Sequence, residues 1–128
     1  MYGARGKNFL QIGAPTWART LADVTAQMAA RWLRATPPDR ATLSGTYHAT
    51  AASHTSWCAF ATEILERAEA MGLGRSPIVA PIPTSAYPTP ARRLMNSVLD
   101  TAKLGAVFGL ALPAWDESLT LCLQELRA

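Results

Sequence analysis

Apolar residues recur every three or four positions along the segment between Thr16 and Pro37. In a helix, side chains with this spacing lie on one face, and that face can pack against a core. The pattern predicts an amphipathic helix over residues 17–35, with Thr16 as its N-cap and the pair Pro37-Pro38 as its stop. The predicted apolar face consists of Leu21, Val24, Met28 and Trp32.

The same spacing predicts three further helices. One follows Thr55 or Ser56, either of which can act as the N-cap, and ends at Gly72. A shorter helix begins at Asp100, and the last helix follows residues 113–115. The apolar face of the longer helix consists of Trp57, Phe60, Ala61, Ile64, Ala68 and Met71, and that of the last helix consists of Leu119, Cys122, Leu123 and Leu126.

Short β-prone runs lie between these helices. Thr46–Thr50 and Ile78–Ile82 are expected to be strands, and Ser97–Leu99 is expected to be a brief extended piece. The segments Tyr2–Asn8, Gln11–Thr16 and Asp39–Gly45 are expected to be loops. The predicted fold class is therefore α/β, a mixed α+β arrangement of about four helices with two or three short strands.

Length and composition exclude several classes of protein. The chain has 128 residues, enough for one domain or part of one, and 49% of them are apolar. Its apolar runs are too short to span a membrane, and the basic start lacks the hydrophobic stretch of a signal peptide, so a cytoplasmic location is expected. A net charge of +3 with no basic run argues against nucleic-acid binding. Cys58 and Cys122 have no Cys-x-x-Cys or Cys/His pairing, so reduced thiols are expected rather than a metal site.

In residues 87–93, Tyr-Pro-Thr-Pro-Ala-Arg-Arg, two prolines precede two adjacent arginines. Proline fixes φ and donates no hydrogen bond, so this stretch is expected to be stiff and extended. Arg92 and Arg93 would then present two guanidinium groups, which are well suited to bidentate capture of phosphate or carboxylate. No acidic residue occurs between Glu69 and Asp100. Two interpretations stay open at this point, an anion-binding loop and a solvated surface loop.

Motifs for catalysis are absent from the sequence. No serine or cysteine nucleophile accompanies His48 or His54 in a motif such as Gly-x-Ser-x-Gly. His48 is expected to be a packed or hydrogen-bonded strand residue, and His54 a loop or capping residue. There is no Gly-x-Gly-x-x-Gly after a strand and no phosphate-binding P-loop. The residues alone therefore indicate a ligand-binding part without a catalytic centre.

The order of several short motifs is more specific. They are Tyr-Gly-Ala-Arg-Gly-Lys-Asn-Phe at 2–9, Gln-Ile-Gly-Ala-Pro-Thr-Trp-Ala at 11–18, Gly-Thr-Tyr-His-Ala-Thr at 45–50, Thr-Ser-Trp at 55–57, Tyr-Pro-Thr-Pro-Ala-Arg-Arg at 87–93 and Asn-Ser-Val-Leu-Asp at 96–100. This series extends over essentially the whole chain. It resembles the C-terminal half of the dTDP-4-dehydrorhamnose reductases, which are extended short-chain dehydrogenase/reductases.

The resemblance implies a nucleotide-sugar reductase of dTDP-L-rhamnose biosynthesis, which supplies bacterial polysaccharides. Such enzymes use NADPH to reduce the 4-keto group of dTDP-4-dehydro-L-rhamnose. Their N-terminal Rossmann half holds the nucleotide, and a Tyr-x-x-x-Lys pair supplies the proton. Residues 1–128 would be the smaller part that binds the dTDP-sugar substrate. The substrate-binding residues that the resemblance implies are Gln11, Pro15, Thr16, Trp17, Arg92, Arg93 and Asn96, with the Arg92-Arg93 loop reaching the pyrophosphate.

The sequence departs from the family pattern in three ways. The glycine-rich nucleotide loop and the Tyr-x-x-x-Lys pair are absent, so no catalytic residue is assigned. NADPH, which is implied for the complete family enzyme, is therefore not expected to bind this chain alone. Leu10 joins Phe9 directly to Gln11, where the family has a helix and a strand. Leu94 replaces a proline that usually follows the paired arginines, which loosens the loop slightly.

Three interpretations follow from the sequence. The leading one is a truncated reductase that keeps the sugar-nucleotide-binding part, lacks the Rossmann cofactor domain and is inactive alone. The alternative is a non-catalytic interaction or regulatory module that docks on a complete reductase or self-associates through exposed helix faces. The third is a gene remnant. None of the three involves nucleic acid, a membrane or a metal ion.

Overall fold

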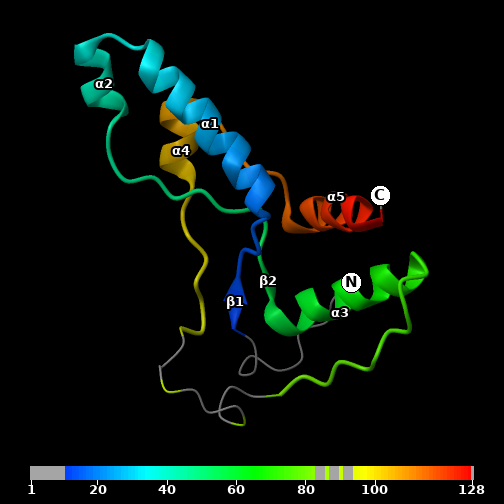
Figure 1. The fold of residues 1–128 in the computed structure, drawn as a ribbon. Coiled ribbons are helices and arrows are strands. Elements are labelled where there is room, and N and C mark those ends of the chain that lie inside the picture. Colours follow the sequence, from blue (N-terminus) through cyan, green and yellow to red (C-terminus); the bar gives the residue numbers. More distant parts are fainter. Residues whose placement is uncertain (1–10, 83–85, 87–89, 91–93, 128) are drawn as a thin grey trace. The chain divides into compact units, whose positions relative to one another are not determined.

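The computed structural model describes residues 11–82, 86, 90 and 94–127 (Figure 1). The chain divides into two compact units, each built from two separate segments. The first unit consists of Met1–Gly13 and Thr55–Val98, and the second of Ala14–His54 and Leu99–Ala128. The described residues form five helices and one two-stranded sheet, which confirms the mixed α/β class. The loop predicted for 2–8 lies outside the described residues. The loop predicted for 11–16 was wrong at Ile12–Gly13, which form a strand because a partner strand pairs with them.

The first unit contains the sheet and one helix. Strand β1 (Ile12–Gly13) pairs antiparallel with β2 (Thr55–Ser56), and helix α3 (Trp57–Ala70) follows β2 directly. Ser56 caps α3 as predicted, because its hydroxyl accepts a hydrogen bond from the amide of Ala59 at 3.0 Å. Gly72, at a φ of 75°, ends the helical segment as predicted.

The predicted apolar face of α3 is only partly covered. None of the residues of α3 is buried, and Trp57 is 54% exposed. The ring of Trp57 meets that of Phe60 edge to face, with their centroids 6.0 Å apart. The face is therefore apolar and regular, but within the described chain it does not enclose a core.

The second unit contains the other four helices. They are α1 (Ala18–Arg34), α2 (Pro37–Leu43), α4 (Ala102–Phe108) and α5 (Trp115–Arg127). The predicted helix over 17–35 is confirmed as α1, and the predicted helices after Asp100 and after 113–115 are confirmed as α4 and α5. In Figure 1 the long α1, blue to cyan, leads directly into the short α2. Among the described residues, no helix is long and apolar enough to cross a membrane.

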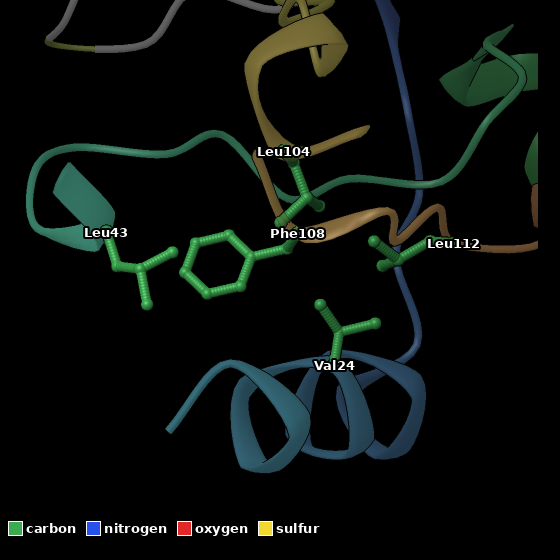
Figure 2. Close-up of a cluster of buried hydrophobic side chains, with 5 residues drawn as sticks. All are labelled: Val24, Leu43, Leu104, Phe108 and Leu112. Atoms are coloured by element: carbon green, nitrogen blue, oxygen red, sulfur yellow. The ribbon is translucent and has the colours of Figure 1, made fainter. Parts of the chain in front are cut away.

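One hydrophobic cluster joins α1, α2 and α4 (Figure 2). Leu104 is fully buried, and the ring of Phe108 meets that of Tyr47 edge to face at 5.1 Å. Burying such side chains is the main favourable term in folding. The cluster consists of Val24, Leu43, Leu104, Phe108 and Leu112.

The loop predicted for 39–45 was wrong, because residues 37–43 form α2. Thr36 caps this helix, and its hydroxyl oxygen accepts a bond from the amide of Asp39 at 3.5 Å. Pro37 and Pro38 occupy the first two helical positions, where the missing N–H costs nothing. The prolines therefore end α1, as predicted, and also begin the next helix.

The strands predicted at 46–50 and 78–82 were also wrong. Thr46–Thr50 finds no pairing strand; instead Tyr47 packs on the core, and its hydroxyl donates to the carbonyl of Leu43 at 2.9 Å. His48, expected to be a packed or hydrogen-bonded residue of that strand, is exposed. Residues 78–82 form no strand, and Ile78 is 98% exposed. Pro81 has no backbone N–H to donate to a neighbouring strand.

Three local predictions need correction. Trp17, not Thr16, occupies the N-cap position of α1. The carboxylate of Asp100 accepts a bond from the amide of Ala102 at 2.8 Å, but Thr101 is the N-cap residue of α4. Cys122 is half-buried and Leu126 is 74% exposed in α5, so only part of the predicted apolar face is covered. The buried part consists of Leu119 and Leu123.

Candidate functional site

In the first unit, Ile12 brings two of the predicted site residues, Gln11 and Asn96, onto adjacent stretches of backbone. Gln11 precedes it, and the carbonyl of Gln11 accepts a bond from the amide of Trp57 at 3.3 Å. On its other side Ile12 forms a parallel bridge with Asn96. Gln11 and Asn96, which are far apart in the sequence, therefore lie on adjacent stretches of backbone.

The bridge to Asn96 is held by several hydrogen bonds. The amide of Ile12 donates to the carbonyl of Met95 at 2.9 Å, and the amide of Ser97 donates to the carbonyl of Ile12 at the same distance. The hydroxyl of Ser97 donates to that carbonyl as well, at 3.1 Å. The side-chain oxygen of Asn96 accepts from the amide of Val98 at 2.9 Å, which fixes a turn just after the bridge.

Gly13 lies close to the side chain of Ser97. A Cβ atom at this position would lie 3.0 Å from the hydroxyl oxygen of Ser97. Gly13 is buried, and it is the last residue of β1. Both residues lie within the motifs at 11–18 and 96–100, but their approach to each other was not predicted, because a contact between positions so far apart leaves no local pattern.

In the second unit, two hydrogen bonds of the Thr16 side chain hold the segment before α1 in place. Its hydroxyl donates to the carbonyl of Ala14 at 2.9 Å, and its oxygen accepts from the amide of Ala51 at 3.1 Å. The hydroxyl is therefore occupied within the protein. Pro15 and Trp17 on either side are half-buried, which leaves part of each ring open to contact.

Trp17 lies beside an ion pair that the sequence did not reveal. The guanidinium carbon of Arg19 is 5.9 Å from the centre of the Trp17 ring, and the same guanidinium pairs with the carboxylate of Glu125 on α5. Both members of this pair are largely exposed, so the interaction contributes little stability. Its effect is to place a cation next to the aromatic ring.

The predicted site residues thus fall into three groups. Gln11 and Asn96 are brought together in the first unit, and Pro15, Thr16 and Trp17 are consecutive in the second. Arg92 and Arg93 lie outside the described residues. Within the described part of the chain, no group of three or more His, Cys, Asp or Glu side chains could hold a metal ion. The described site residues can therefore form hydrogen bonds through the amides of Gln11 and Asn96 and pack a ligand against the rings of Pro15 and Trp17.

Comparison with known proteins identifies the family. The model of the RmlD substrate binding domain matches residues 6–128. This chain belongs to that family. The RmlD substrate-binding-domain assignment agrees with the resemblance seen in the sequence motifs.

Several dTDP-4-dehydrorhamnose reductases are similar to this RmlD-family chain. That of Burkholderia thailandensis is 42% identical over 98% of the chain, and that of Escherichia coli K12 is 42% identical over 91%. The crystal structure of the Bacillus anthracis reductase in complex with NADP aligns with 90% of the chain, with a TM-score of 0.73 and 26% identity. The fold is therefore that of a part of these reductases.

The chain spans about half the length of these relatives or less. It covers 49% of the Burkholderia protein, 38% of the Escherichia coli protein and 36% of the Bacillus chain. The Burkholderia match extends over 148 residues, more than the 128 of this chain. The relative therefore has residues within the matched span that this RmlD-family chain lacks.

Proposed function

We propose that this chain is the dTDP-sugar-binding part of a dTDP-4-dehydrorhamnose reductase. The observation that carries the proposal is the match of residues 6–128 to the RmlD substrate binding domain. The geometry supports it, because Gln11 and Asn96 are fixed on adjacent stretches of backbone in the first unit. In the proposed complex these two amides bind the polar groups of the nucleotide sugar.

The proposed roles of the other residues follow from their chemistry. Pro15 and Trp17 offer rings against which a base or sugar packs. Thr16 positions the segment between them, because its hydroxyl is already bonded within the chain. Arg92 and Arg93 are proposed to bind the two phosphates, since guanidinium groups bind such oxygens bidentately.

The residues of this chain do not fit NADPH. The sequence has no glycine-rich dinucleotide loop, and no tyrosine has a lysine four positions later. A reductase of this class needs the glycine-rich loop to hold the cofactor and the tyrosine–lysine pair to supply the proton. We therefore propose that this chain binds the dTDP sugar without reducing it.

A turnover assay tests this proposal. The chain is mixed with NADPH and dTDP-4-dehydrorhamnose, and NADPH absorbance is followed against a complete reductase of the family. We expect no oxidation of NADPH above the rate without protein. Turnover by this chain that depends on the sugar nucleotide would refute the proposal.

A second candidate function, an interaction module, has one observation in its favour. All the buried apolar side chains of the described residues belong to the second unit, whereas α3 in the first unit has no buried residue. A partner, either a second copy or a complete reductase, would cover the apolar face of α3. Light scattering after size exclusion, with and without a complete reductase, tests this function; a monomer in both runs would rule it out.

A further inference from the structure

An open groove of about 700 Å³ lies against α1 and α2 in the second unit. This volume is within the range of small-molecule sites. The groove is lined by residues between 27 and 43, so it includes none of the residues proposed above to bind the dTDP sugar. Its polar lining consists of Gln27, Arg31, Arg34, Asp39 and Thr42.

Arg31 and Arg34 are the cations of this groove. They are three residues apart on α1, so their side chains lie on the same side of the helix. Among the described residues, neither guanidinium has an ion pair or a hydrogen bond. Arg31 lies over the ring of Phe108, with its guanidinium carbon 5.5 Å from the ring centre. Because Phe108 is buried, this contact restrains Arg31 at the groove.

Arg40, rather than Arg31 or Arg34, binds terminal carbonyl groups of α1. Basic residues in the last turn of a helix commonly bind its terminal carbonyl groups. Here Arg40 donates to the carbonyl of Trp32 at 3.1 Å and to that of Leu33 at 2.8 Å. Two terminal carbonyls of α1 are therefore bonded by a third arginine, which leaves the guanidinium groups of Arg31 and Arg34 available to a ligand.

The single acid of the groove is already engaged. The carboxylate of Asp39 accepts a bond from the hydroxyl of Thr36 at 2.6 Å. Asp39 also lies in the first turn of α2, where the helix dipole stabilises negative charge. The hydrogen bond leaves the carboxylate charged, so the lining carries the two positive charges of Arg31 and Arg34 against the one negative charge of Asp39.

We propose that this groove binds the oxyanion group of a small molecule, a phosphate or a carboxylate, between Arg31 and Arg34. Guanidinium groups bind both anions with paired hydrogen bonds. Gln27 and Thr42 then contact the uncharged part of the ligand. The groove shares no residue with the site proposed for the dTDP sugar, and the proposal does not depend on that site.

An NMR titration tests the proposal. Inorganic pyrophosphate and citrate are added separately to the labelled chain at low salt, which distinguishes phosphate from carboxylate. With at least one probe we expect saturable shifts at the amides of Ala35 and Leu43, which line the groove. The double variant Arg31→Gln/Arg34→Gln should weaken the affinity measured at these amides about tenfold or more.

Two control variants make the result specific. Arg75→Gln removes an exposed cation of the first unit, and it should change the affinity less than twofold. Arg92→Ala/Arg93→Ala should leave the shifts at Ala35 and Leu43 intact, even if dTDP binding is lost. The proposal is overturned if neither probe shifts these amides, if the Arg31/Arg34 variant binds as tightly as wild type, or if Arg75→Gln weakens binding equally.

Discussion

Ser97 binds the carbonyl oxygen of Ile12 twice, through its amide at 2.9 Å and through its hydroxyl at 3.1 Å. This double contact holds the backbone around Asn96 against β1. It therefore fixes the position of Asn96 relative to Gln11, the two residues of the first unit that we propose to bind the nucleotide sugar.

A double-mutant cycle of Gly13→Ala and Ser97→Ala tests this relationship. The added Cβ of Gly13→Ala meets the hydroxyl of Ser97, so the substitution should weaken the bridge. In the Ser97→Ala background that hydroxyl is gone, and Gly13→Ala should cost less. We expect a coupling of about 0.5–3 kcal/mol, measured by hydrogen exchange at the amide of Ile12. Strictly additive effects would show that the two residues do not interact.

The core of the second unit gives a prediction about stability. Leu104 is fully buried in the cluster with Phe108 and Val24, so Leu104→Ala removes packed methyl groups and leaves a cavity. We expect a loss of about 2–5 kcal/mol in the free energy of unfolding, measured with urea. The matched variant Leu33→Ala, at a position that is 64% exposed, should stay within about 0.5 kcal/mol of wild type. Similar losses for both variants would contradict the assigned core.

The hydroxyl of Thr16 gives a third prediction. Thr16→Val keeps the shape of the side chain but leaves the amide of Ala51, a buried residue, without its acceptor. The expected loss in the free energy of unfolding is about 1–3 kcal/mol. Thr16→Ser keeps the hydroxyl, so its free energy of unfolding should be close to that of wild type. A Thr16→Val variant that is as stable as wild type would show that this hydrogen bond contributes no stability.

Local signals in the sequence were enough to predict most helices. The spacing of apolar residues gave α1, and Ser56 and Gly72 marked the two ends of α3 because caps act over a few residues. The helix α2 was missed because Pro37-Pro38 was interpreted only as a stop. Two strands were predicted wrongly because β-prone runs form strands only where a partner is available, and Thr46–Thr50 has none.

The candidate site could be predicted only in part from the sequence. The motifs indicated Gln11 and Asn96, but their approach through Ile12 depends on a bridge between distant positions. The close approach of Ser97 to Gly13 also joins positions that are far apart in the sequence. Such long-range contacts are decided by tertiary packing, so no local pattern could have predicted them.

The most direct test of the proposed function is a calorimetric titration of dTDP into three forms of the chain. They are wild type, Arg92→Ala/Arg93→Ala and the control Arg75→Ala. If the chain is a dTDP-sugar-binding part, wild type and the control should bind dTDP with equal affinity. The double variant should bind about tenfold or more weakly, because charge-assisted bonds to the phosphates are lost. No binding by wild type, or equal affinity for all three forms, would contradict this account.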